Sequence, residues 1–237
     1  MKKYLALILV FVFIGTMAYA EPCPLPCSAN TDAEILFKGF EWYTDYPTVK
    51  ATAIAKGMSD SWYFDWFSED TCTTPHWKTL VNSIGSFAGS ETGCGGSLQY
   101  YTDVPDVAGY KVDSLDLYFM WKLNGYKANY KDPNATQFYM AKYELDVDDT
   151  VACYRDLVEK LKTIYGNKPY SDSYGWLDPT EYTLWVNGEE ALVGVSYDSY
   201  KVYLVYMAPG AEQKLVEVEN YKRKQQIERA KDDMTGL

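Results

Sequence analysis

The chain has 237 residues, a formal net charge of -11, and 47% hydrophobic residues. This length suits one domain or two small ones, with enough apolar residues to build a core. An acidic chain repels phosphate groups, which argues against non-specific binding to nucleic acids or anionic membranes. The 23 tyrosines fit the strands of a sheet better than a tyrosine-rich binding surface, although tyrosine is common in both.

The first 20 residues have the features of a secretory signal peptide. Lys2-Lys3 precedes an apolar run from Leu5 to Ile14, and Ala18-Tyr19-Ala20 matches a small-x-small cleavage site. The apolar run is too short to span a bilayer comfortably, so an N-terminal anchor is the weaker alternative. Removal of residues 1–20 takes away two lysines and changes the net charge from -11 to -13. We therefore expect a secreted, extracellular protein with no membrane attachment in its mature form.

The five cysteines predict disulfides, because an oxidising compartment favours them over metal sites. Cys72 and Cys94 flank a Gly- and Ser-rich region, which a bridge would stabilise by roughly 3 kcal/mol. Cys23 and Cys27 could close a small ring or could reach the other pair. Cys153 is the expected unpaired cysteine, because it lies at the edge of a helix's apolar face. No His or Cys cluster has the spacing of a zinc site, and we expect no cofactor and no metal.

A Pro-rich segment, residues 21–32, leads into the predicted domain, residues 33–209. An aromatic run over residues 61–70 follows the domain's first predicted helix and is either a buried strand or an exposed platform. If it is exposed, indole rings could stack on a sugar or another small ligand. The candidate ligand-binding residues are therefore Trp62, Trp66 and Trp77.

The clearest helical pattern runs from Val147 to Tyr165, with apolar residues on one face and charged residues on the other. Asp146 and Asp148 are candidate N-caps, and Gly166 can adopt a positive φ at the other end. The acidic residues at the start could suggest a calcium site. Helix capping explains them without a metal, because carboxylates are favoured at a helix N-terminus.

Alternating apolar and polar residues predict seven strands, and the short turns between the last three require antiparallel pairing. A helix followed by strands occurs twice, over residues 44–145 and 146–207. The expected fold is therefore α+β, with helices packed on one face of an antiparallel sheet. A charged helix or tail is expected over residues 210–237. The predicted strands are residues 98–102, 109–112, 115–122, 137–145, 182–186, 191–197 and 201–207.

The stretch from Phe37 to Lys50, with Phe-Glu-Trp-Tyr-Thr-Asp at its centre, resembles the opening of uncharacterised secreted bacterial α+β domains. Those domains usually carry a Trp-Gly-Thr-Ser stretch, and Tyr43 and Asp45 stand here for its Gly and Ser. Residues 161–169 resemble the second half of the same domains. The repeated helix-then-sheet order is similar to beta-lactamase-inhibitor-protein-like folds. That resemblance implies binding to other proteins without catalysis.

The sequence contains no recognisable catalytic constellation. His76 is the single histidine, and no nucleophile-elbow pattern accompanies it. The expected function is therefore non-enzymatic binding of an extracellular protein or glycan, through the sheet face that the helices leave open. A carbohydrate- or small-ligand-binding module that uses the tryptophans is the alternative. A hydrolase with paired carboxylates in a cleft between helix and sheet is a third hypothesis.

Overall fold

The computed structural model describes residues 30–37, 39–59, 64–66, 94–123, 125–127, 131–174, 180–188 and 191–235. Its centre is an 8-stranded antiparallel sheet with the strand order β1-β2-β3-β4-β8-β7-β6-β5. The predicted α+β class, the antiparallel sheet and the C-terminal helix are confirmed. The strands are β1 (Asp65–Trp66), β2 (Gly95–Tyr100), β3 (Val112–Trp121), β4 (Thr136–Asp146), β5 (Tyr170–Tyr174), β6 (Thr180–Val186), β7 (Leu192–Tyr197) and β8 (Lys201–Met207). The helices are α1 (Tyr46–Ala55), α3 (Thr150–Tyr165) and α4 (Ala211–Thr235), with a 3₁₀ turn, η2 (Pro133–Ala135).

The sheet consists of two four-stranded units that join where β4 pairs with β8, a boundary that we call the seam. Along the chain, α1 precedes the strands of the first unit and α3 precedes those of the second. The predicted order of helix then strands, twice over, is thus the observed order. The strand assignment was wrong in two places. Residues 109–111 contribute only an isolated bridge, between Tyr110 and Val107, and Val112 is the first residue of β3. In addition, β5 forms where no strand was expected.

Helices α1 and α3 pack on the same face of the sheet, which we call the first face. Across the seam Leu145 lies opposite Val202, so both side chains point to this face. Val49 of α1 packs in the same cluster as Phe138 of β4. The apolar stripe of α3 packs against β7 and β8, and its buried residues are Cys153, Tyr154, Leu157, Val158, Leu161 and Tyr165. The predicted stripe is therefore the core of the second unit, with the exception of Ile164, which was assigned to it and is exposed.

The start of α3 differs in detail from the prediction. Its N-cap is Asp149, whose carboxylate accepts a hydrogen bond of 2.9 Å from the backbone nitrogen of Ala152. Asp146 and Asp148 lie too early in the chain for this role, because only the residue just before the first turn can reach that nitrogen. Gly166 ends the helix with a positive φ of 97°, as predicted.

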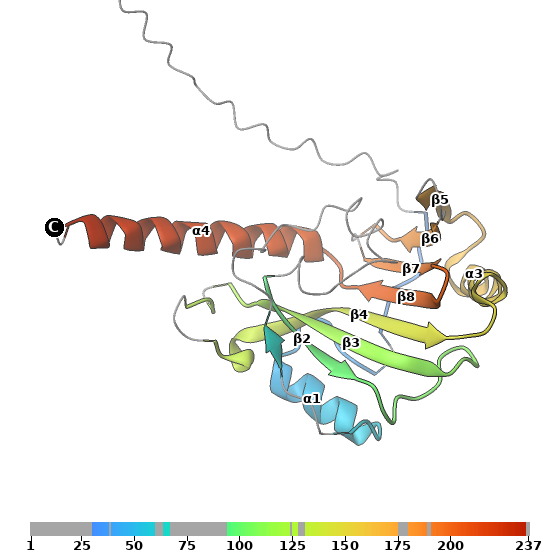
Figure 1. Ribbon diagram of the computed structural model, residues 1–237. Helices are drawn as coiled ribbons and strands as arrows, with labels where there is room; N and C mark the ends of the chain where they lie inside the picture. Colours follow the sequence, from blue (N-terminus) through green and yellow to red (C-terminus); the bar gives the residue numbers. More distant parts are fainter. Residues whose placement is uncertain are drawn as a thin grey trace, which may run out of the picture.

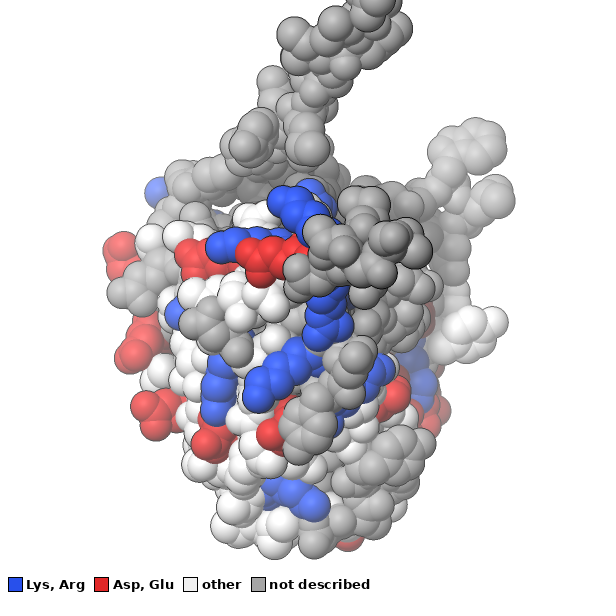
Figure 2. All heavy atoms as spheres, turned by 90° about the vertical axis from the view of Figure 1, so that its left-hand side faces the viewer, with Lys and Arg blue, Asp and Glu red and all other residues white. Residues whose placement is uncertain are grey.

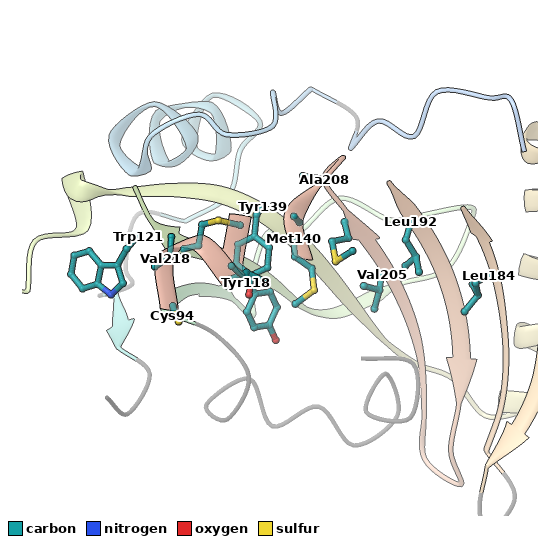
Figure 3. Packing of buried hydrophobic residues seen from close by; sticks show 14 of the residues in the cluster. Cys94, Tyr118, Trp121, Tyr139, Met140, Leu184, Leu192, Val205, Ala208 and Val218 are labelled. Atoms are coloured by element: carbon teal, nitrogen blue, oxygen red, sulfur yellow. The ribbon is translucent and has the colours of Figure 1, made fainter. Parts of the chain in front are cut away.

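The opposite face, which we call the second face, carries the N-terminal half of α4. Figure 1 shows α1 and α4 on opposite sides of the sheet, with α4 running out past its end. Ala211, Leu215 and Val218 of α4 are buried in the core cluster of this face. In Figure 3 the labelled side chains of this cluster form a row across the sheet from Trp121 to Leu184. Helix packing is thus not confined to the first face.

Candidate functional site

A pocket of about 460 Å³ opens on the first face, between the C-terminal end of α1 and the loop that joins β2 to β3. Five separate segments of the chain contribute to it, and β4 and β8 each supply one residue. It falls within the size range of small-molecule sites in proteins. Its lining residues are Leu36, Phe37, Phe40, Lys56, Met58, Pro105, Asp106, Val107, Ala108, Tyr143 and Tyr206.

Aromatic rings packed around Phe37 form one side of the pocket. The Phe37 ring lies 5.1 Å from Phe40, 5.6 Å from Tyr143 and 5.5 Å from Tyr206, measured between ring centroids. Tyr143 pairs with Leu204, and Tyr206 pairs with Ala141. The two tyrosines are therefore diagonal neighbours across the seam, one from each unit of the sheet.

The opposite wall is the β2–β3 loop, which hydrogen bonds fasten to α3. The Tyr110 hydroxyl donates to Asp156 Oδ2 at 2.8 Å. Lys160 Nζ donates to the carbonyl oxygen of Ala108 at 2.8 Å and forms an ion pair with the same Asp156 oxygen at 2.6 Å. Ala108 itself has a φ of 52°, a left-handed conformation that a residue with a Cβ rarely adopts. These contacts hold the wall in place before any ligand arrives.

The two tyrosine hydroxyls remain neutral donors at ordinary pH. Burial raises the pKa of Tyr143 to about 12. Burial also raises the pKa of Tyr206, and the neighbouring Tyr165 and Tyr143 add to that effect. Two ionisable residues of opposite sign, Lys56 and Asp106, also line the pocket, and both are exposed. The pocket thus combines apolar rings, neutral hydroxyl donors, one cation and one anion.

This composition suits binding better than the hydrolytic chemistry considered above. Asp106 is the one carboxylate among the described lining residues, whereas a carboxylate hydrolase needs two. Within the described part of the chain, no group of three or more His, Cys, Asp or Glu side chains could hold a metal ion. An apolar cavity with a few polar groups is instead typical of a small-molecule binding site.

Of the three candidate tryptophans, Trp66 lies within the described residues, whereas Trp62, Trp77 and also His76 do not. Trp66 lies on the edge strand β1 and is half-buried. Its ring stacks on Trp121 with centroids 4.8 Å apart and an interplanar angle of 21°, and Lys131 Nζ lies 5.9 Å from its centroid. A tryptophan ligand platform stays a prediction.

Figure 2 views the molecule from the end of the sheet where β3 leads into β4. Lys and Arg side chains gather in the middle of this face, with Asp and Glu side chains around them. Both signs of charge are therefore present at this end, although the whole chain is acidic, with a net charge of -11.

Two of the five cysteines lie in the described residues. Cys94 is disulfide-bonded, and the other cysteines, Cys23, Cys27 and Cys72, lie outside that part of the chain, so its pairing with Cys72 stays a prediction. Cys153 is free and buried, as expected. Burial raises the pKa of its thiol to about 11, which keeps the thiol protonated and unreactive at neutral pH.

The second face is not the open surface that we expected. Its central side chains are buried, and they include a charged cluster that was not predicted from the sequence. Lys142 on β4 lies directly opposite Asp116 on β3, with Nζ 3.1 Å from Asp116 Oδ2 and 2.7 Å from Glu144 Oε1. Ser196 is also fully buried. A lysine in an alternating strand normally indicates a solvent-facing side, which explains the wrong prediction.

None of the described helices is long and apolar enough to cross a membrane. The predicted signal peptide, residues 1–20, lies outside the described residues. No family model, curated protein or solved structure matches this chain. The resemblances to secreted bacterial α+β domains and to beta-lactamase-inhibitor-protein-like folds therefore stay predictions.

Proposed function

We propose that this chain is a secreted, non-enzymatic binding protein that holds a small apolar molecule in the pocket between α1 and the β2–β3 loop. The observation that carries the proposal is the pocket itself, about 460 Å³ in volume and lined by rings grouped around Phe37. Such a cavity can bury most of the surface of a small ligand, and each Å² of apolar surface removed from water contributes about 25 cal/mol.

A small ligand fits the described surface better than a protein partner on the open face of a sheet. The second face, where a partner was expected to bind, has its central residues buried. The described opening that several aromatic rings line is on the first face, between the end of α1 and the β2–β3 loop, where the half-buried Tyr143 and Tyr206 form part of the lining. The small-ligand alternative therefore becomes the main proposal, with a different set of residues from Trp62, Trp66 and Trp77.

The test is binding of a neutral apolar fluorophore, N-phenyl-1-naphthylamine, to the purified mature protein. Fluorescence should rise with saturation in the micromolar range, and a dissociation constant on the order of 10 μM corresponds to about 7 kcal/mol. A Leu36→Trp variant should reduce the affinity at least tenfold, because the larger side chain would occupy the mouth of the pocket.

The matched control is Leu123→Trp, on the turn after β3 and away from the pocket. Leu36 and Leu123 are both 53% exposed, so the two substitutions add the same aromatic surface to the molecule. The control should bind the fluorophore like the wild-type protein. An equal loss in both variants, or no saturable binding to the wild-type protein, would overturn the proposal.

A further inference from the structure

We infer that the ligand of this pocket is an apolar molecule with a single carboxylate, bound by the hydroxyls of Tyr143 and Tyr206 and by the ammonium of Lys56. This inference rests on the proposed function and names its ligand class. A carboxylate has two oxygens and about four acceptor positions, so it can accept hydrogen bonds from three donors at once. The rest of the ligand would lie against the apolar lining beside Phe37 and Phe40.

The two hydroxyls are available for this role. Both tyrosines line the pocket, and neither hydroxyl forms a hydrogen bond with any other described residue. Since Tyr143 and Tyr206 are diagonal neighbours across the seam, their hydroxyls can approach one group from two strands. They remain protonated well above neutral pH, so each can donate to an anion. Hydrogen bonds to an ionised acceptor are roughly twice as strong as neutral ones.

Lys56 supplies the positive charge. Its Nζ lies 5.6 Å from the centroid of the Phe40 ring, and a Cβ on Gly39 would come within 2.2 Å of it. The ammonium is thus folded back over the backbone of Gly39, at the edge of the pocket. It forms no ion pair with another described residue, so its charge is not already neutralised by a carboxylate in that part of the protein.

Asp106 is the group that opposes this inference, because it lines the same pocket and carries a negative charge. It is exposed, on the loop fastened to α3, whereas the two hydroxyls lie on the sheet. An amino acid would use Asp106 for its ammonium group and Lys56 for its carboxylate. The three donors outnumber this single acceptor, which favours a ligand that is only an acid over a zwitterion.

The experiment compares two fluorescent ligands with the same hydrocarbon chain, the anionic cis-parinaric acid and its neutral methyl ester, titrated into the mature protein at pH 7. The acid should bind at least tenfold more tightly, which corresponds to about 1.4 kcal/mol. Lys56→Gln and the double variant Tyr143→Phe/Tyr206→Phe should each reduce the preference for the acid, because they weaken binding of the acid more than binding of the ester. Asp106→Asn should strengthen binding of the acid, because it removes a repulsive charge.

The outcomes separate this inference from the proposed function. Equal binding of the acid and the ester overturns the carboxylate inference and leaves small-ligand binding standing. If neither the acid nor the ester binds, and the neutral fluorophore does not bind either, both the carboxylate inference and the proposed function are overturned. Displacement of the acid by phenylalanine at a lower concentration than by octanoate overturns the inference in favour of a zwitterion. Unchanged preference in the Lys56 and tyrosine variants, with circular dichroism showing that they are folded, also overturns it.

Discussion

Replacing Lys142 with methionine should destabilise the protein by roughly 3–5 kcal/mol, because it leaves a buried carboxylate without its ammonium partner. The Lys142 and Asp116 side chains are only 5% and 4% exposed, and their charged atoms are 3.1 Å apart. Without Lys142, Asp116 Oδ2 keeps a 3.2 Å hydrogen bond from the Tyr118 hydroxyl, and its other oxygen has no hydrogen-bond partner. A single neutral donor does not compensate a buried charge.

Thermal and urea denaturation at pH 7, followed by circular dichroism, measure this effect. Each kcal/mol shifts the Tm of a domain of this size by about 2–4 °C, so the variant should melt roughly 6–20 °C lower. The control is the double variant Lys142→Met/Asp116→Leu, which removes both charges and should recover most of the lost stability.

The pH dependence of the Lys142→Met variant provides a second check. Burial raises the pKa of Asp116 above its ordinary value, and loss of Lys142 removes the charge that opposes this rise. A carboxyl whose folded pKa lies above its unfolded pKa costs stability at high pH, and this cost disappears as the pH falls toward the unfolded pKa of about 4. The deficit should therefore be larger at pH 8 than at pH 5. A loss below 1 kcal/mol at pH 7, or a double variant no more stable than the single one, would refute the reasoning.

Three further predictions concern the loop, the sheet edge and the buried tyrosines. Tyr110→Phe removes a hydrogen bond to α3 and should cost about 1 kcal/mol, with faster hydrogen exchange in the β2–β3 loop; unchanged exchange would show that other contacts hold the loop. Gly96→Ala should displace β1 and cost about 1–3 kcal/mol in urea denaturation, because its Cβ would lie 2.4 Å from the carbonyl oxygen of Asp65. Gly188→Ala, with no atom within 4 Å, should change stability by less than about 0.5 kcal/mol, and equal effects at the two sites would contradict the packing argument. Because burial raises the pKa of Tyr143 from 10.0 to about 12, its contribution to stability is complete below pH 10 and is lost as the pH rises from 10 to 12. A tyrosinate absorbance titration should then show late ionisation together with loss of the circular dichroism signal, and complete ionisation before any unfolding would disprove it.

The periodicity of apolar residues predicted the helices and strands that bury one side against a neighbouring element. The stripe of α3 and the alternation in β3, β4, β7 and β8 are strong because each lies against a covered face, and packing then dictates the residue types. β5 was missed because Tyr170–Tyr174 places small polar residues between its tyrosines, and the strand forms through its pairing with β6. The strand β5 forms because it pairs with β6, and the residue pattern within β5 alone does not indicate that pairing.

The pocket was not predictable from the sequence. Its aromatic side joins Phe37, from the segment before α1, with Tyr143 and Tyr206, which are 63 positions apart in the chain. No motif links these residues, and only the pairing of β4 with β8 brings the two tyrosines together. The aromatic run over residues 61–70 was a candidate because its aromatic residues lie close together in the sequence, whereas a site on a sheet is assembled from strands that are distant in the chain.

The seam gives this pocket a role in holding the two units together. Tyr143 belongs to the unit that ends with β4, and Tyr206 belongs to the unit that ends with β8. A ligand that contacts both tyrosines binds only the joined units, so its binding energy adds to the free energy of their association. If the chain were divided at the exposed residues 148–149, the first fragment would carry every lining residue of the pocket except Tyr206, which the second fragment would supply. The concentration of the ligand would then determine what fraction of the two fragments is assembled. Association of the fragments could therefore serve as a sensor of the ligand.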